Sequence, residues 1–292
     1  TFVVARAVVR DTTETQASGS KIAYISMETA ICPMFGPALG GLMDGWFGWE
    51  ANFWFIGGLG LFILIIAYFD LGETVPENTQ GFRQQFSEYP ELLLSRRFWG
   101  YCLASAFGAG AFFAYLGGGP FVGSIVYNLS PEMLGLYFGA PAIGYFFGNF
   151  LSGRFTIRFG IDAMILWGLW IIFSGLSLSM ICSYIGYGTV ETFFGFMIFV
   201  GLGNGLTIPN ATAGMLSVRP HLAGTASGLG GAMMIAIGAA LSTLAGAFLV
   251  PGSNEMPLLM LMWLSSLSGV AVIIYVRQRN KRLKNHSNAG SS

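Results

Sequence analysis

One carboxylate, Glu28, stands inside an otherwise apolar run of this sequence, about two turns from the start of the run. An ionised carboxylate facing lipid costs roughly 2.5–3.5 kcal/mol on insertion scales, so such a group faces a polar cavity, pairs with a cation or is protonated. Burial raises the pKa of carboxyl groups, which lets them take up and release protons. Glu28 is therefore a candidate proton-exchanging residue. The alternative is that it snorkels to the interface or pairs with Lys21, seven residues earlier.

Amide, aromatic and methionine side chains inside other apolar runs are candidates for binding a ligand. Asn204 and Asn210 flank Pro209 in one such run, where polar groups face protein or water, and an interhelical hydrogen bond is the rival explanation. Aromatic and methionine side chains suit a cavity that accepts varied lipophilic compounds, although most of them serve ordinary packing. The candidate cavity residues are Met27, Ile31, Phe112, Phe113, Tyr137, Asn204, Asn210 and Met233.

The elements that position these residues are long apolar segments. Hydrophobic residues make up 54% of the 292 residues and charged residues 10%, far fewer charges than soluble domains carry. A membrane-spanning helix needs about 20 apolar residues, and these runs lack the period-two alternation of barrel strands. The predicted spans are Ile22–Met43, Ala51–Phe69, Phe98–Val122, Met133–Gly153, Ala163–Tyr184, Thr192–Leu216, Ala223–Val250 and Pro257–Val276.

The charges predict how these spans are threaded through the membrane. All 14 Lys and Arg residues fall in alternate connections: Arg6, Arg10, Lys21; Arg83, Arg96, Arg97; Arg154, Arg158; Arg219; Arg277, Arg279, Lys281, Arg282, Lys284. The other connections, Asp44–Glu50, Ser124–Glu132, Tyr184–Glu191 and Pro251–Met256, contain none. The positive-inside rule makes the basic side cytoplasmic, with the C-terminus there. Basic residues in short loops and one tail do not form a nucleic-acid-binding face.

Four parts follow from this organisation. Residues 1–69 hold an incomplete upstream bundle, 70–97 a polar cytoplasmic loop, 98–276 a bundle of six helices, and 277–292 a basic cytoplasmic tail. Thr1–Val9 reads as the end of a helix whose beginning is absent, so we expect the chain to be part of a longer protein.

At the start of one span, Ser130-Pro131-Glu132 supplies a capping hydroxyl, a first-position proline and an acid in the first turn.

The first full span carries a kinked, glycine-lined face. Its prolines, Pro33 and Pro37, remove backbone donors, while Gly36, Gly40 and Gly41 allow another helix to approach closely. Generic packing of small residues is the alternative. The pattern Gly36-Pro37-x-x-Gly40-Gly41 resembles the antiporter motif of drug:proton antiporters in the major facilitator superfamily.

Further stretches resemble the bicyclomycin/chloramphenicol resistance branch of that superfamily. They are Ala5–Asp11, Gly117–Val122 and Arg219–Gly228, in the order that the branch has them. The resemblance implies a partial major-facilitator fold: an all-α polytopic membrane protein with eight full transmembrane helices plus a stub of a ninth. It also implies a monomeric inner-membrane secondary transporter that exchanges protons for drugs or other small amphiphilic compounds by alternating access.

Another segment, Gly148–Gly160, resembles a degenerate copy of the superfamily's loop motif in which the usual aspartate is replaced. Arg154 and Arg158 could bond helix-end carbonyls or Asp162 and latch the cytoplasmic face in one state. Arginines that only set topology are the equal alternative.

The sequence leaves two alternatives, a transporter of another family and an intramembrane enzyme. An exporter with a ten-helix repeat would need the stub to be a complete helix and two similar halves, which the long loop at 70–97 disfavours. An intramembrane enzyme would need a Ser/His pair, clustered acids or a metal set within the spans. The two histidines, His221 and His286, lie outside them, so we expect no enzyme, cofactor or metal site. Cys32, Cys102 and Cys182 are expected to be packing residues.

Overall fold

The computed structural model describes residues 36, 39–70, 90–219 and 222–289, and every regular element in these ranges is a helix. The elements are α3 (Glu50–Asp70), α5 (Arg96–Phe121), the π-helical turn η1 (Val122–Val126), α6 (Pro131–Phe138), α7 (Ala140–Phe159), α8 (Ile161–Tyr184), α9 (Val190–Val218), α10 (Ala223–Phe248) and α11 (Met256–Ala289). Residues 39–47 also form a helix, which contains the end of the predicted span Ile22–Met43; most of that span lies outside the described residues. For the described residues, the prediction of a helical fold is confirmed.

Six segments among the described residues are long and apolar enough to cross a membrane. They are Glu50–Phe69, Arg96–Val126, Ile161–Tyr184, Val190–Val218, Gly224–Phe248 and Met256–Arg279. Each overlaps one predicted span, because length and apolar character are local properties that the sequence displays directly. The predicted tail at 277–292 continues α11 as a helix to Ala289.

The predicted span Met133–Gly153 is two helices rather than one. A break at Gly139 separates α6 from α7, and α7 then runs on to Phe159. Pro141 lacks an N–H group, so it cannot donate to the carbonyl of Tyr137, and Gly139 is a weak helix former. Ser130 caps α6 as predicted, its hydroxyl accepting a hydrogen bond from Met133 N at 3.4 Å.

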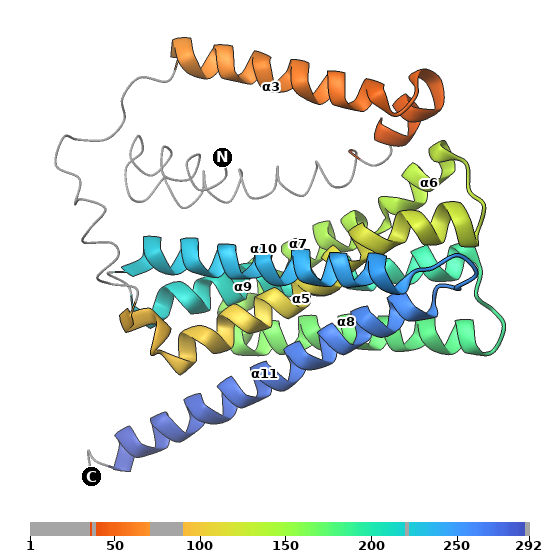
Figure 1. Cartoon of the computed structure of the whole chain (residues 1–292). Helices are drawn as coiled ribbons and strands as arrows, with labels where there is room; N and C mark the ends of the chain where they lie inside the picture. The colour runs from red at the N-terminus through yellow and green to blue at the C-terminus, as the bar shows by residue number, and fades with distance from the viewer. Residues whose placement is uncertain (1–35, 37–38, 71–89, 220–221, 290–292) are drawn as a thin grey trace.

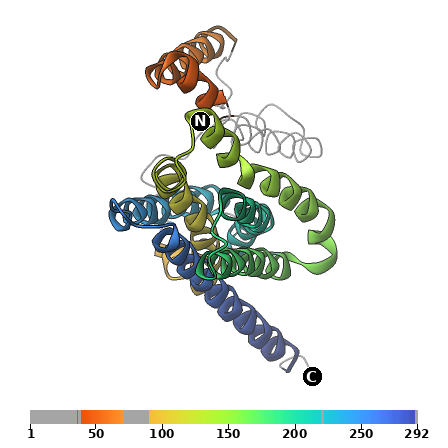
Figure 2. The same ribbon diagram turned by 90° about the vertical axis from the view of Figure 1, so that its right-hand side faces the viewer.

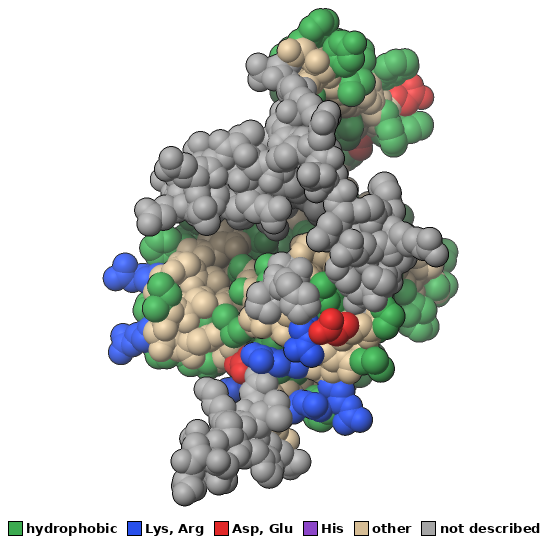
Figure 3. Space-filling model, turned by 90° about the vertical axis from the view of Figure 1, so that its left-hand side faces the viewer, with side chains coloured by type: hydrophobic (Ala, Val, Ile, Leu, Met, Phe, Trp, Pro, Cys, Tyr) green, Lys and Arg blue, Asp and Glu red, His purple; other side chains and the backbone are tan. Residues whose placement is uncertain are grey.

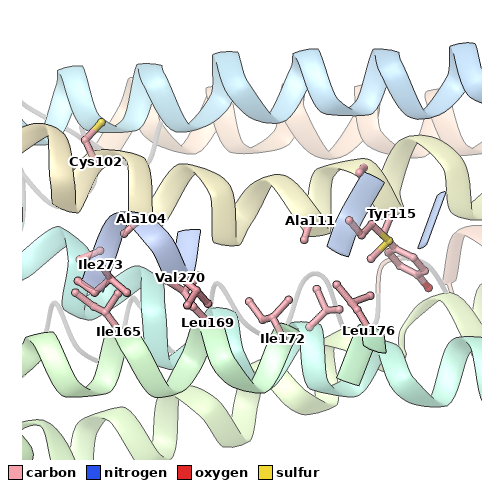
Figure 4. Close-up of a cluster of buried hydrophobic side chains, with 14 of the residues drawn as sticks. Cys102, Ala104, Ala111, Tyr115, Ile165, Leu169, Ile172, Leu176, Val270 and Ile273 are labelled. Atoms are coloured by element: carbon pink, nitrogen blue, oxygen red, sulfur yellow. The ribbon is translucent and has the colours of Figure 1, made fainter. Parts of the chain in front are cut away.

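Helices α5 and α7–α11 form one bundle (Figure 1). Helix α9 packs between α7 and α8, while α5 packs against α9, α10 and α11. The core is apolar, and Figure 4 shows side chains from α5, α8 and α11 meeting in it: Cys102, Ala104, Ala111, Tyr115, Ile165, Leu169, Ile172, Leu176, Val270 and Ile273. Helix α3 stands apart from this bundle in two perpendicular views (Figures 1 and 2), and its side chains are almost all exposed.

The basic side chains of the described bundle all lie at one of its two ends. Helices α5, α8 and α10 begin at one end, where α7, α9 and α11 emerge from the bundle (Figure 1), and this basic end carries Arg96, Arg97, Arg154, Arg158, Arg219, Arg277 and Arg279. Figure 3 looks at this end and shows the basic side chains gathered there. The opposite, acid end carries Glu132, Glu191 and Glu255 near helix starts. The sorting is the one that the sequence predicted.

Glycines hold α7 against α9 with almost no space between their backbones. A Cβ atom on Gly144 would overlap the carbonyl oxygen of Ile198, and one on Gly201 would overlap the carbonyl oxygen of Pro141. By contrast, a Cβ on Gly153 of α7 or on Gly195 of α9 would meet no heavy atom within 4 Å. Of these four glycines, Gly144 and Gly201 are therefore the two that packing requires.

We predict that Gly144→Ala and Gly201→Ala each destabilise the protein by about 1–3 kcal/mol, the usual cost of overpacking. Alanine is the better helix former, so propensity alone would stabilise both variants. Thermal unfolding followed by size-exclusion chromatography measures the effect. The control variants Gly153→Ala and Gly195→Ala should keep wild-type stability; a similar loss in all four variants would contradict the packing argument.

Candidate functional site

The glycine motif of the first span lies against α6. A Cβ atom on Gly41 would come within 2.6 Å of the carbonyl oxygen of Pro131 and 3.0 Å of Gly135 Cα, so the two backbones are in direct contact. A Cβ on Gly40 would only touch Asn52 Oδ1 at 3.5 Å, and one on Gly36 would meet nothing within 4 Å. Pro37 lies outside the described residues. Of the described motif glycines, Gly41 is the one that the contact requires.

A small groove of about 200 Å³ runs along this contact. It is formed by the helix at 39–47, the start of α3, the end of α5 and α6. Asn52 at its edge donates a hydrogen bond from Nδ2 to the carbonyl oxygen of Gly40 at 3.2 Å. The groove is lined by Gly40, Gly41, Asp44, Asn52, Pro120, Pro131, Leu134, Gly135 and Phe138. We call the helix at residues 39–47 the motif helix. The motif helix and the downstream bundle therefore share one interface at the acid end.

Helix α6, which carries the bundle side of this interface, has a joint at each end. The turn η1 precedes it with π-helical hydrogen bonding, a feature that often marks functional sites, and the break at Gly139 follows it. Tyr115 of α5 holds α6 in place: its ring stacks on Phe138 with centroids 4.6 Å apart, and its hydroxyl donates to the Phe138 carbonyl at 3.1 Å. Helix α6 is thus a separate eight-residue segment between two interruptions of regular α-helix, tied to α5 through Tyr115.

Two acidic side chains, Glu132 and Glu191, lie at the acid end beside the site. The Ser130 side chain and the backbone N–H at the start of α6 hold the pKa of Glu132 below its ordinary value, so this carboxylate stays ionised beside Gly45. Tyr137 donates to Glu191 Oε1 at 3.4 Å, which joins α6 to the start of α9. Tyr137, a predicted cavity residue, therefore reaches the acid end of the bundle.

Glu255 is a residue that the sequence analysis did not single out. It precedes α11, is only 6% exposed and accepts a hydrogen bond of 2.5 Å from the hydroxyl of Ser183 at the end of α8. A buried carboxylate with this hydrogen bond ties the loop before α11 to the end of α8. Its position in a short polar loop gave no sign that it is buried.

The other predicted cavity residues lie on several helices. Phe112 and Phe113 on α5 and Met233 on α10 are half-buried, and a Cβ on Gly238 of α10 would overlap the Phe113 ring. Phe113 therefore packs α5 against α10. Glu28, Met27 and Ile31 lie outside the described residues, so the described part of the chain presents one portion of the predicted cavity set.

The two amides have different surroundings. Asn210 donates to Ser152 Oγ and to the Leu206 carbonyl, both at 2.7 Å, and accepts from Thr156 Oγ1 at 2.9 Å. These contacts join α9 to α7, which favours the structural explanation for Asn210. Asn204 is 3% exposed, and neither of its side-chain polar atoms has a hydrogen-bond partner among the described residues.

The residues of the predicted latch lie at the basic end. Arg154 and Arg158 are exposed on the last turns of α7, and the Arg158 guanidinium lies 5.2 Å from the centroid of the Phe159 ring. Asp162 in the first turn of α8 accepts a hydrogen bond of 2.7 Å from the hydroxyl of Tyr101 on α5. A latch between these arginines and Asp162 stays a prediction.

Comparisons of this chain with a family model and with known proteins agree on one family. The model of the Major Facilitator Superfamily matches residues 1–243. The bicyclomycin resistance protein homolog of Haemophilus influenzae is 27% identical over 289 residues, which cover 95% of this chain and 70% of that protein. The chloramphenicol resistance protein of Pseudomonas aeruginosa is 31% identical over 219 residues, 72% of this chain and 50% of that protein. The matches thus span 50–70% of these relatives' lengths.

A solved structure has the same fold. It is the crystal structure of a bacterial homolog of the human lysosomal transporter Spinster, in an inward-facing and unoccupied conformation. The TM-score is 0.54 at 17% sequence identity, and the match covers 93% of this chain and 71% of that one.

We predict that Gly41→Ala opens the interface between the motif helix and α6, because the added methyl group meets backbone that cannot turn away. In purified full-length protein without its other cysteines, Leu134→Cys should react several-fold faster with a water-soluble maleimide when Gly41→Ala is present. Gly40→Ala, one residue earlier, should leave the rate unchanged. Equal labelling rates in wild type and Gly41→Ala would contradict the contact.

Proposed function

The chain belongs to the Major Facilitator Superfamily, and from this premise we propose that it works as a proton-coupled secondary transporter that exports drugs or other small amphiphilic compounds. The relatives named for bicyclomycin and chloramphenicol resistance support this substrate class. Family membership points to a transporter rather than an enzyme. The observation that carries the proposal is the backbone contact between Gly41 and α6, which joins the motif helix to the downstream bundle.

The mechanism that we propose is alternating access through this contact. When the motif helix and α6 are together, the acid end of the transporter is closed; when α6 tilts at its two joints, this end opens and releases substrate. Packed interfaces switch between discrete arrangements rather than deforming continuously. A glycine at position 41 lets the closed state bring backbone against backbone, which limits leakage of protons.

The proposed orientation places the basic end in the cytoplasm and the acid end outside the inner membrane, with the C-terminus cytoplasmic. It follows from the positive-inside rule applied to the arginines of the described helices. We further propose that the protein acts as a monomer within the lipid bilayer. Its ligands are then protons and one small molecule, and the cavity would include Phe112, Phe113 and Met233 together with residues of the upstream helices.

Glu28 is the proposed proton-exchanging residue. A carboxyl group in an apolar helix is stable there when protonated, or when it faces a polar cavity. Proton entry from outside would protonate it, and release to the cytoplasm would follow the change of state.

Export is tested with everted membrane vesicles that contain the full-length protein. Vesicles with an acidic interior should accumulate ethidium and chloramphenicol, because the proton gradient drives substrate in the outward direction. A protonophore should abolish the accumulation, and vesicles without the protein should show none. Accumulation that persists with the protonophore, or that needs ATP after the gradient has collapsed, would refute proton coupling.

The role of Glu28 is tested by Glu28→Gln, which keeps the shape of the side chain but cannot release a proton. Transport by this variant should lose most of its pH dependence while the drug still binds. Glu50→Gln, which changes an exposed acid beside the first apolar runs, is the matched control and should behave as wild type. An unchanged pH profile in Glu28→Gln would exclude Glu28 from the coupling step.

A further inference from the structure

A second groove lies at the basic end of the bundle, far from the motif helix. It runs between the start of α5 and the last turns of the membrane-spanning part of α11. Its volume is about 440 Å³. Its lining residues are Arg96, Trp99, Gly100, Leu103, Ala271, Val272 and Tyr275. From Arg96 to Leu103 the groove follows about two helical turns, or roughly 10 Å, into the apolar layer. We name it the α5–α11 groove.

The mouth of this groove is cationic and its floor is apolar. The guanidinium groups of Arg96 and Arg279 both lie close enough to the half-exposed Tyr275 hydroxyl to interact with it. Two cations that converge on one neutral phenol retain their capacity to bind an anion. Deeper in the groove, Leu103, Ala271 and Val272 offer only hydrocarbon.

Two acids of the described residues at this end of the bundle, Glu91 and Asp162, have partners of their own. Glu91 accepts from Arg219 Nε at 2.6 Å, and Asp162 accepts from the Tyr101 hydroxyl at 2.7 Å. In sequence, Lys281, Arg282 and Lys284 continue the positive charge along α11. The mouth of the groove therefore lies in a field that attracts anions.

Trp99 in the wall of the groove indicates the depth at which the groove would lie in a membrane. Its indole Nε1 donates to the Leu93 carbonyl at 2.7 Å, which holds the ring at the wall of the groove. Tryptophan rings of this kind prefer the headgroup level of a bilayer. The guanidinium groups then lie at phosphate depth and the apolar floor at acyl-chain depth.

We propose that the α5–α11 groove binds one anionic phospholipid of the adjacent leaflet, with its phosphate on Arg96 and Arg279 and part of an acyl chain along Leu103 and Val272. A larger groove of about 620 Å³ between α7, α8 and α9 is equally apolar, but no basic residue lines it. Charge complementarity therefore selects the α5–α11 groove. In the proposed orientation this lipid belongs to the cytoplasmic leaflet, but its binding does not depend on which compound the protein exports.

Native mass spectrometry of the purified full-length protein, titrated with phosphatidylglycerol, tests the proposal. Wild type should bind one phosphatidylglycerol more tightly than phosphatidylethanolamine, which carries no net charge. Arg96→Gln combined with Arg279→Gln should weaken this binding on the order of tenfold. Arg154→Gln combined with Arg158→Gln removes the same charge from the same end and should leave binding unchanged.

A second variant tests the acyl-chain part without changing charge. Ala271→Trp places a ring in the groove from an exposed position and should also remove the tight phosphatidylglycerol. Equal losses in the two double-arginine variants would show general attraction to a basic surface and overturn the proposal. So would equal binding of the two lipids, wild-type binding by Ala271→Trp, or displacement of the lipid by ethidium, which would make the groove a substrate path.

Discussion

The structure depends on one constraint: lipid cannot hydrogen-bond to a polypeptide. Every backbone N–H and C=O inside the membrane must be satisfied within the protein, which makes each crossing segment a helix and restricts charged groups to the ends. The sorting of arginines to the basic end and of Glu132, Glu191 and Glu255 to the acid end follows directly. Where the helical ladder is interrupted, at η1 and at Gly139, the chain lies near the acid end, beside the interface with the motif helix. Helix α6, the proposed moving element, therefore lies near the end of the bundle, where the need to satisfy backbone hydrogen bonds within the protein is weakest.

Within a lipid solvent, helices associate by close packing rather than by excluding water, and glycine decides how closely they approach. Close glycine contacts of this kind occur at two places in this chain. Gly144 and Gly201 fix α7 to α9 inside the bundle, where a permanent contact is needed. Gly41 brings the motif helix against α6, which is interrupted at both ends, and in the proposed mechanism this contact forms and separates. In this proposal, the difference between a structural and a switching contact lies in what each glycine packs against.

The sequence predicted the features that depend on local composition. Apolar runs such as Ala163–Tyr184 became helices, Ser130 became a cap, and Gly41 lies at a helix contact. It did not predict features that depend on how distant segments meet. The break at Gly139 was hidden in a continuous apolar run, and the hydrogen bonds of Asn210 needed the register of α7 against α9. The burial of Glu255 and the α5–α11 groove likewise arise only when α8 or α5 packs beside α11.

The threading of these helices is the claim on which transport direction, the role of the acid end and the leaflet of the bound lipid all depend. The most direct test is labelling of single cysteines in intact cells with a membrane-impermeant maleimide, in full-length protein whose native cysteines have been replaced. Cysteines at Asn128 and Thr189, in the connections at the acid end, should react from outside, and cysteines beside Arg96 and Arg219 should react only after the membrane is opened. Labelling of the Arg96 and Arg219 sites in intact cells, with Asn128 and Thr189 protected, would contradict the account.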